Sequence, residues 1–271
     1  MAEECIHGLD AGLCDICFPK PRPIVETPPA PTRRAPASRP LSSRSLSSRT
    51  ASGKPSRRAA TLFEPKPVDV GEQRIYHLTH VSNLASILEA RALLADASPT
   101  IDISSAAARD ARRLAPVAGL DGPRVSAFVP FFLSPNAGIW EGIRSGTVDP
   151  RLAPETIGTD PAEFVILVSM VKAIVESEAT PVVSDGDAAH VLTRFAGTAE
   201  ANERMLRSLR GDEDSIIGAE YLVHDLVPFE LISLIGVAHD RARDGVKAIL
   251  KGTEWKTKVA VYPPWFARPE S

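Results

Sequence analysis

The sequence predicts an α+β domain that fills most of the chain, and we place it at residues 68–271. Two observations predict this fold class. Short apolar, β-rich runs and helical patterns follow one another irregularly, whereas a doubly wound sheet would need strict alternation of strands and helices. In addition, about 200 residues are enough for one domain with a substantial hydrophobic core.

The first half of this domain begins with a short strand at 76–79. Ser82 is expected to cap the helix that follows, because apolar residues then recur at nearly helical spacing. The positions that carry this spacing are Leu84, Ile87, Leu88 and Leu93. Residues 104–114 predict a second helix, which brings together Arg109, Arg112 and Arg113.

The second half contains two apolar, β-rich runs at 125–133 and 163–170, and the latter is expected to be a buried strand. A short helix is expected at 185–194. The remaining elements are expected to be strands at 220–223, 234–237 and 259–262, together with a helix that Asp240 caps and that ends near Gly252.

Residues 19–67 differ in composition from the rest of the chain. They contain 11 Pro and 8 Ser, with 11 Lys and Arg against 2 Asp and Glu, a net charge of +9. Such a segment cannot bury enough apolar surface to offset the entropy of ordering it. We therefore expect a disordered basic linker between residues 1–18 and the α+β domain.

The whole chain has a formal net charge of −3 and 3 Cys. No apolar run reaches the roughly 20 residues that a membrane span needs, and the N-terminus has no apolar signal-peptide core. Three cysteines make no disulfide framework. The sequence therefore predicts a cytoplasmic protein that does not span a membrane.

Several common enzyme signatures are absent from the sequence. It has no Gly-x-Gly-x-x-Gly after a strand, no P-loop, no His-Glu-x-x-His and no Gly-x-Ser-x-Gly. The sequence therefore does not favour a Rossmann dehydrogenase, a P-loop NTPase, a zincin or an α/β-hydrolase.

The N-terminal run from Cys5 to Cys17 predicts a metal site. It places Cys5, His7, Cys14 and Cys17 within 13 residues, and Cys14-x-x-Cys17 has zinc-knuckle spacing. A Cys3His set is a closed tetrahedral site for structural zinc, with no open position for catalysis. The alternative is a group of unrelated thiols near the chain terminus.

Three further patterns suggest a nucleotide site. His77, Thr79 and His80 cluster just before the first helix and are suited to hydrogen-bond a polar nucleotide. The arginines of 109–113 suit phosphate recognition, and Glu220 opens an otherwise apolar strand. Each pattern also has a simpler explanation: a satisfied strand end, a solvated helix face and a strand-edge acid, respectively.

Taken in order, these segments resemble the DarT family, the DNA ADP-ribosyltransferase toxins of toxin–antitoxin pairs. The resemblance covers about residues 74–250. The matching pieces are Tyr76-His77-x-Thr79-His80-x-x-Asn83-Leu84, Ile103 followed by Arg112, Phe128-Val129-Pro130-Phe131-Phe132, Ser184-Asp185-Gly186-Asp187-Ala188 and Ala219-Glu220-Tyr221-Leu222-Val223.

The resemblance implies an ADP-ribosyltransferase fold, in which two packed β-sheets with flanking helices surround an NAD cleft. It implies transfer of ADP-ribose from NAD to a base of single-stranded DNA, and a cognate antitoxin as a partner. By position, His77, Thr79 and Asn83 fall at the NAD site. Arg112 matches the family's catalytic arginine, and Glu220 matches its catalytic glutamate.

The implied chemistry needs these residue types. Breaking the nicotinamide–ribose bond builds oxocarbenium character on the sugar, as in glycoside transfer. A carboxylate such as Glu220 stabilises that cation by holding a ribose hydroxyl, and it can accept a proton from the base. An arginine such as Arg112 binds the pyrophosphate or positions the target base.

The stretch 135–141 departs from the family pattern, as does Ala127-Phe128. This region is the expected seat of the acceptor, so RNA or protein remains an alternative acceptor. Trp140 lies in this stretch and is either a base-stacking residue or a core residue. An alternative from another class is a non-catalytic, zinc-containing nucleic-acid-binding or adaptor protein on a degenerate transferase scaffold.

Overall fold

The structure is a computed structural model that describes residues 69–119 and 122–268. The Cys/His motif at 1–18 and the basic linker at 19–67 lie outside the described residues. Within them the chain is a mixed α+β fold, as the sequence predicts. No helix in the described part of the chain is both long and apolar enough to cross a membrane.

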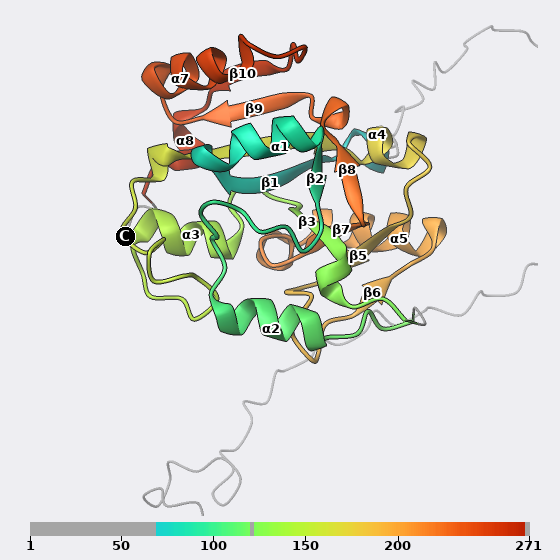
Figure 1. Ribbon diagram of the computed structural model, residues 1–271. Helices are drawn as coiled ribbons and strands as arrows, with labels where there is room; N and C mark the ends of the chain where they lie inside the picture. The colour runs from blue at the N-terminus through green and yellow to red at the C-terminus, as the bar shows by residue number, and fades with distance from the viewer. Residues whose placement is uncertain (1–68, 120–121, 269–271) are drawn as a thin grey trace, which may run out of the picture. The chain divides into compact units, whose positions relative to one another are not determined.

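Eight of the described strands form one sheet with the order β10-β9-β4-β1-β3-β7-β5-β6 (Figure 1). Neighbouring strands pair antiparallel, except that β9 and β10 are parallel. The bounds are β1 Arg74–His80, β3 Phe128–Phe132, β4 Phe164–Met170, β5 Pro181–Ser184, β6 Phe195–Ala196, β7 Glu220–His224, β9 Leu234–Val237 and β10 Lys258–Val261. A separate pair is formed by β2 Ala92–Leu94 and β8 Leu226–Pro228.

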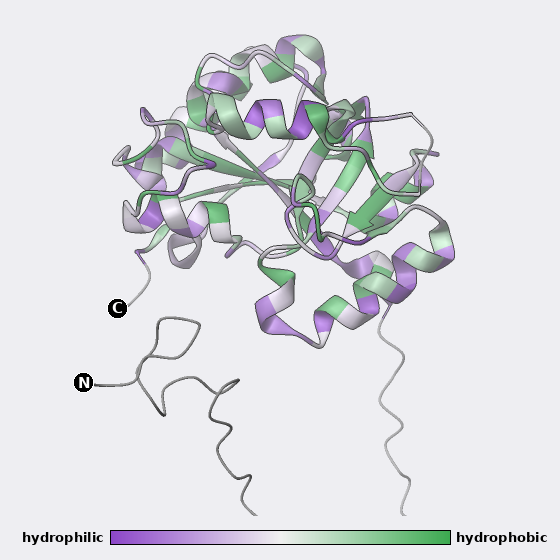
Figure 2. Cartoon of the chain, turned by 90° about the horizontal axis from the view of Figure 1, so that it is seen from below, coloured by the Kyte–Doolittle hydropathy of each residue, from purple (hydrophilic) through white to green (hydrophobic). Residues whose placement is uncertain are grey.

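Helices flank this sheet (Figure 1). Their bounds are α1 Leu84–Ala90, α2 Ala106–Leu114, α3 Gly138–Ser145, α4 Val171–Glu176, α5 Ala199–Arg210, α6 Glu213–Ile216, α7 Asp240–Leu250 and α8 Pro263–Phe266. The larger helices carry hydrophilic residues on part of their surface, whereas the strands are mostly apolar (Figure 2).

The join between β1 and β3 divides the sheet into two halves. β1 pairs with β4 along its whole length, but it pairs with β3 only at Tyr76 and Phe132. Beyond that pair the two strands diverge, and the halves run in different directions (Figure 1). The two sheets expected of the fold are thus halves of one continuous sheet here. Their divergence leaves room for the cavity described below.

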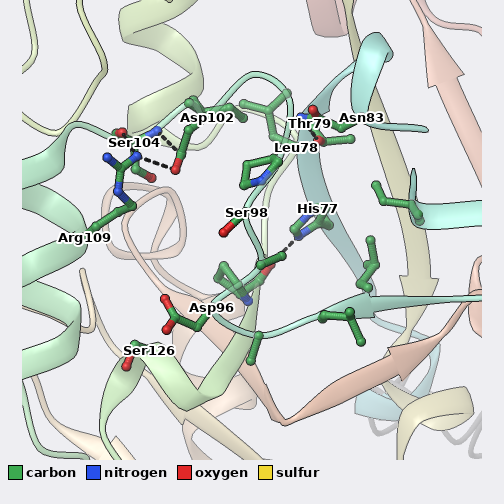
Figure 3. A pocket seen from close by; sticks show the side chains of 18 of the residues that line it. His77, Leu78, Thr79, Asn83, Asp96, Ser98, Asp102, Ser104, Arg109 and Ser126 are labelled. Carbon is green, nitrogen blue, oxygen red and sulfur yellow. Dashed lines mark hydrogen bonds and ion pairs between the residues drawn. The ribbon is translucent and has the colours of Figure 1, made fainter. Parts of the chain in front are cut away.

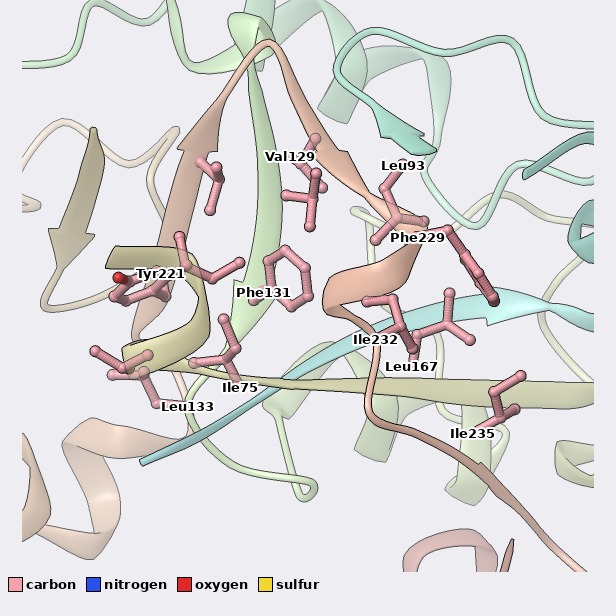
Figure 4. Close-up of a cluster of buried hydrophobic side chains, with 14 of the residues drawn as sticks. Ile75, Leu93, Val129, Phe131, Leu133, Leu167, Tyr221, Phe229, Ile232 and Ile235 are labelled. Atoms are coloured by element: carbon pink, nitrogen blue, oxygen red, sulfur yellow. The ribbon is translucent and has the colours of Figure 1, made fainter. Parts of the chain in front are cut away.

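Alternate residues of the central strands enter two main cores. One core contains Ile75, Phe131, Leu167, Tyr221 and Ile235 (Figure 4). The other contains Leu78, Trp140, Phe164 and Ile166. β4 is buried on both faces, which explains its continuous run of apolar residues.

The predicted first helix needs two corrections. Ser82 is not its N-cap: the His80 side chain accepts a hydrogen bond from the backbone N–H of Ser82, and a 3₁₀ turn precedes α1. Leu93 is not in the helix either. Arg91 adopts a left-handed conformation with φ 60° and ends α1, so Leu93 lies on β2.

The predicted helix at 185–194 is wrong. This segment is the loop between β5 and β6, and its ends are tied together. The Arg194 N–H donates to the Asp185 carboxylate at 2.8 Å, while the Asp185 N–H donates to the Arg194 carbonyl at 3.1 Å. Side-chain hydrogen bonds of this kind compete with helix formation at Asp. The predicted cap of α7 is also displaced by one residue, because His239 rather than Asp240 caps it.

Gly236 on β9 lies directly against the ring of Trp265. A Cβ atom at this position would lie 2.7 Å from Trp265 Cζ3, closer than packed atoms tolerate. We expect Gly236→Ala to lower the free energy of unfolding by about 1–3 kcal/mol, measured by urea denaturation. Gly245→Ala is the matched control, because nothing lies near that position in α7. It should be stabilising by about 0.5–1 kcal/mol, since alanine favours the helix.

Candidate active site

A cavity of about 460 Å³ opens where β1 and β3 diverge (Figure 3). Its walls come from these two strands, from α1 and β2, from the loop 95–104 and from α2. The volume falls in the range of small-molecule sites. The cavity brings together five of the polar residues that the sequence singled out, namely His77, Thr79, Asn83, Arg109 and Arg112.

His77 bridges the gap between the diverging strands. Its Nδ1 lies 2.9 Å from the carbonyl oxygen of Pro130 on β3 (Figure 3). Because a carbonyl only accepts, Nδ1 carries the proton of the neutral ring, and Nε2 is left as an acceptor. Burial lowers the pKa of His77 below its ordinary value of 6.5, and the Pro130 hydrogen bond opposes only part of this effect. His77 is therefore a neutral acceptor at neutral pH.

Thr79 and Asn83 form a buried polar pair beside His77. The Asn83 Nδ2 donates to Thr79 Oγ1 at 3.0 Å and to the Ile101 carbonyl at 2.8 Å. The Asn83 Oδ1 accepts from the Ile101 N–H at 3.0 Å. These bonds fasten the loop 95–104 to the end of β1. Asn83 thus borders the cavity with its amide already engaged, which suits a residue that shapes the site.

Arg112 and Glu220 form a bidentate ion pair. The Arg112 Nη1 and Nη2 donate to Oε1 and Oε2 of Glu220 at 3.1 and 3.0 Å. Arg112 lies on α2, whose N-terminus Ser105 caps, and Glu220 is the first residue of β7. Both side chains are largely buried, at 20% and 5% exposure. Residues 108 apart in the chain therefore converge on one point.

The loop after β5 holds Glu220 in place. The Ala188 N–H donates to Glu220 Oε1 at 3.1 Å, and the Glu220 N–H donates to Ser184 Oγ at 3.2 Å. Ser184 in turn donates to the carbonyl of Gly186 at 2.7 Å. Since paired strand residues share a face, the pairing of Phe132 with Glu220 places the carboxylate beside a residue that lines the cavity. Glu220 itself reaches the cavity wall through Arg112.

The surroundings of Arg112 favour its charged form. Burial would lower the pKa of Arg112, but the Glu220 carboxylate and, more weakly, Asp187 more than offset this, so the pKa is raised. A fixed cation thus remains at the cavity wall at every physiological pH. Asp187 also accepts from Arg151 Nη1 at 3.5 Å.

The remaining residues singled out in the sequence lie in different surroundings. Arg109 lines the cavity but is engaged with Asp102 and, at 3.1 Å, with the Ser104 carbonyl (Figure 3). Arg113 is exposed and pairs with Asp96. Trp140 is 1% exposed in the second core and donates to the Trp265 carbonyl, so it is a core residue and not a stacking platform.

Sequence reasoning did not find the main-chain groups of the site. The Pro130 carbonyl orients His77, and the Ala188 N–H binds Glu220. A backbone donor or acceptor has no residue-type signature, so no pattern could have singled these groups out. Asp102 and the loop 95–104 were also missed, although Asp102 precedes the helix with its three arginines and could have been paired with one of them.

The divided sheet, the buried arginine–glutamate pair and the histidine–threonine strand agree with the class that the sequence resemblance implies, the ADP-ribosyltransferases. Residues 76–267 match the model of one family within that class, described as "ssDNA thymidine ADP-ribosyltransferase, DarT". The chain belongs to the DarT family.

Individual proteins and solved structures are similar to the chain over most of its length. It is 25% identical over 206 residues to proteins named DNA ADP-ribosyl transferase from Mycobacterium tuberculosis and Mycobacterium bovis, which covers 70% of this chain and 86% of each relative. Among solved structures, it matches Thermus sp. 2.9 DarT in complex with ADP-ribosylated ssDNA with a TM-score of 0.64 and 24% identity, covering 72% of this chain and 96% of that chain. The same protein in complex with NAD+ matches with a TM-score of 0.60 and 24% identity, covering 72% and 98%.

The expected zinc ligands Cys5, His7, Cys14 and Cys17 lie outside the described residues. Within residues 69–119 and 122–268, no group of three or more His, Cys, Asp and Glu side chains is placed to hold a metal ion.

Proposed function

We propose that this protein transfers ADP-ribose from NAD to a thymidine base of single-stranded DNA and releases nicotinamide. One observation carries the proposal: Arg112, which forms a bidentate ion pair with Glu220, lines the same cavity as His77. An acid, a fixed cation and a neutral acceptor are therefore available around one small-molecule site. Membership in the DarT family supports the choice of donor and acceptor.

Glu220 is proposed as the catalytic carboxylate. Its Oε1 already accepts from Arg112 and Ala188, whereas Oε2 accepts only from Arg112. Each carboxylate oxygen can accept about two hydrogen bonds, so Oε2 keeps a free lone pair. We expect this oxygen to hold a ribose hydroxyl, stabilise positive charge developing on the sugar and accept the proton that leaves the base.

Arg112 is proposed to orient Glu220 and to meet the phosphates of NAD. A guanidinium has five N–H donors, and Glu220 engages two of them. The others are available to an anionic pyrophosphate, which planar arginine groups bind well. This arrangement lets one side chain fix the acid and the donor substrate together, and such orientation supplies much of the rate in group transfer.

His77 is proposed to bind the nicotinamide side of NAD. With Nδ1–H directed to Pro130, its Nε2 can accept from a carboxamide N–H or a ribose hydroxyl. Thr79 lies two residues along the strand, on the same side, and Asn83 fixes its hydroxyl. The NAD site would therefore be rigid before the substrate arrives.

The apparent KM for NAD should report the protonation of His77. Because burial lowers the pKa of His77 below 6.5, the ring stays neutral and KM should be constant down to that pH. At lower pH the ring gains a proton on Nε2, loses its acceptor, and KM should rise. Folding stability should fall in the same direction, since the unfolded chain binds the proton more readily. His77→Gln, which cannot titrate, should have a KM that does not change in this window.

The acceptor is tested directly by mass spectrometry. Single-stranded oligonucleotides with and without thymidine, a matched RNA and a bacterial lysate are each incubated with NAD and the full chain. The proposal expects an ADP-ribose adduct only on thymidine-containing DNA. If nicotinamide is released and the adduct forms on RNA or protein instead, the protein is a transferase with a different acceptor. If no nicotinamide is released, the protein is a non-catalytic binding protein.

We also propose that Cys5, His7, Cys14 and Cys17 bind one structural zinc ion. The support is their spacing and ligand type. Metal analysis of the purified full chain should find about one zinc per chain, and Cys14→Ser should lose most of it. Because the site is closed, transferase activity should survive this change. A wild-type chain that contains no zinc would rule the site out.

The biological role we propose is that of a toxin with a cognate antitoxin. Modification of DNA bases would be harmful to the cell that makes the enzyme, and a solved structure of Thermosipho africanus DarTG matches this fold with a TM-score of 0.55. The basic segment at 19–67, with its net charge of +9, would add a salt-sensitive attraction to nucleic acid.

A further inference from the structure

A second cavity of about 550 Å³ lies away from the candidate active site. Three segments border it: the turn at 69–71, α4 with the residues that lead into β5, and α5. Tyr221 of β7 also lines it. Glu220 and Tyr221 are consecutive in this strand, so their side chains point to opposite faces of the sheet. The second cavity therefore does not belong to the site formed by Glu220 and Arg112.

Tyr221 has an unsatisfied hydroxyl. The residue is 1% exposed, and its hydroxyl has no hydrogen-bond partner among the described residues. The ring packs with Ile75 and Phe131 in the core, while the oxygen points away from that cluster, beside α4 (Figure 4). Burial strongly raises the pKa of Tyr221, so the hydroxyl keeps its proton and is a donor. A buried donor without an acceptor is destabilising, and buried tyrosines usually have a partner.

The other buried polar side chain of the cavity, Asn202, is already engaged within the fold. The Asn202 Nδ2 donates to the Pro181 carbonyl at 2.8 Å, and its Oδ1 accepts from the Val183 N–H at 3.3 Å. The charged side chains lie at the mouth: Lys172 is 3.8 Å from Glu176, and Glu203 pairs with Arg207. The exposed Asp69 there accepts from the Gly71 N–H at 2.9 Å. The remaining wall is largely apolar and consists of Val70, Val171, Val175, Ala179, Pro181 and Leu206.

We propose that this cavity binds a small, neutral, mostly apolar molecule with one hydrogen-bond acceptor, such as a carbonyl oxygen, which receives the Tyr221 hydroxyl. The apolar wall disfavours a charged ligand, because burying a charge against apolar side chains is costly. The single unsatisfied donor selects a molecule with one acceptor over a pure hydrocarbon. A volume of about 550 Å³ suits a small molecule.

Two probes of the same shape test this proposal on the full chain. 4-Fluoroacetophenone has a carbonyl, and 4-fluorocumene replaces it with a hydrocarbon group. Their dissociation constants are measured by ligand-observed ¹⁹F NMR. We expect the ketone to bind about tenfold more tightly than the hydrocarbon, the usual effect of one hydrogen bond. Tyr221→Phe keeps the ring and removes the donor, so the two probes should then bind equally.

A blocking variant locates the binding. Val175 is 55% exposed at the mouth, so Val175→Trp should fill the entrance without disturbing the core, and both probes should bind more weakly. Ser98→Trp is the matched control, because Ser98 is an exposed residue on the wall of the first cavity. It should leave both dissociation constants unchanged. The proposal is wrong if neither probe binds, if wild type shows no preference for the ketone, if Tyr221→Phe keeps that preference, or if only Ser98→Trp weakens binding.

Discussion

Replacing Glu220 with glutamine is expected to reduce the rate of ADP-ribosyl transfer by about 10²–10³-fold, the usual cost of losing one preorganised electrostatic group. Glutamine has nearly the same shape, so one oxygen still accepts from Arg112. It has no charge to stabilise the developing oxocarbenium ion and no basic oxygen to take the proton from the base. The rate is measured by mass spectrometry of a thymidine-containing oligonucleotide under saturating NAD.

Two further measurements separate catalysis from folding. Binding of NAD to Glu220→Gln should persist, since His77 and Arg112 remain. Glu163→Gln is the matched control: this carboxylate is 57% exposed and contacts His80 at 3.3 Å, outside the cavity. It should retain full activity. A Glu220→Gln protein that transferred ADP-ribose as fast as wild type would overturn the proposed mechanism.

The elements that the sequence predicted well are those whose signal is local. The continuous apolar run of β4 is a buried strand, and the helix with three arginines is α2, which begins one residue after Ser105. The prediction failed where tertiary contacts decide the conformation of a segment. The segment at 185–194 has residues that a helix tolerates, but the backbone and side chain of Asp185 bind Arg194 and close a loop instead.

The joining of two half-sheets at Tyr76 and Phe132 could not be read from the sequence either. A strand's own residues show that it is a strand, but they do not show how far its neighbour stays paired with it. The strand β5, which packs beside α5, was likewise missed.

The candidate site shows the same difference between local signals, which the sequence carries, and long-range contacts, which it does not. Family resemblance was needed to connect Arg112 with Glu220, because a charge 108 residues away in the chain gives no local signal. Taken alone, each residue had a simpler explanation. The structure adds the geometry: both terminal nitrogens of the Arg112 guanidinium donate to the Glu220 carboxylate.

Replacing Arg112 with methionine is expected to have the largest effect on stability. It would leave the Glu220 carboxylate buried at 5% exposure without its cation, and breaking a buried pair in this way costs about 3–5 kcal/mol. The measurement is the free energy of unfolding from urea denaturation. Arg113→Met is the matched control on the same helix. That arginine is 49% exposed and pairs with Asp96, so its loss should leave the free energy of unfolding nearly unchanged.

A second change separates the structural and catalytic parts of the pair. In the double variant Arg112→Met with Glu220→Leu, no buried charge is left, so most of the lost stability should return. Transferase activity should not return, because neither the cation nor the acid is present. If the double variant were as unstable as Arg112→Met, the pair would stabilise the fold through its hydrogen bonds. If it were active, the acid and the cation would have no part in the chemistry, and the reacting groups would have to lie elsewhere on the cavity wall.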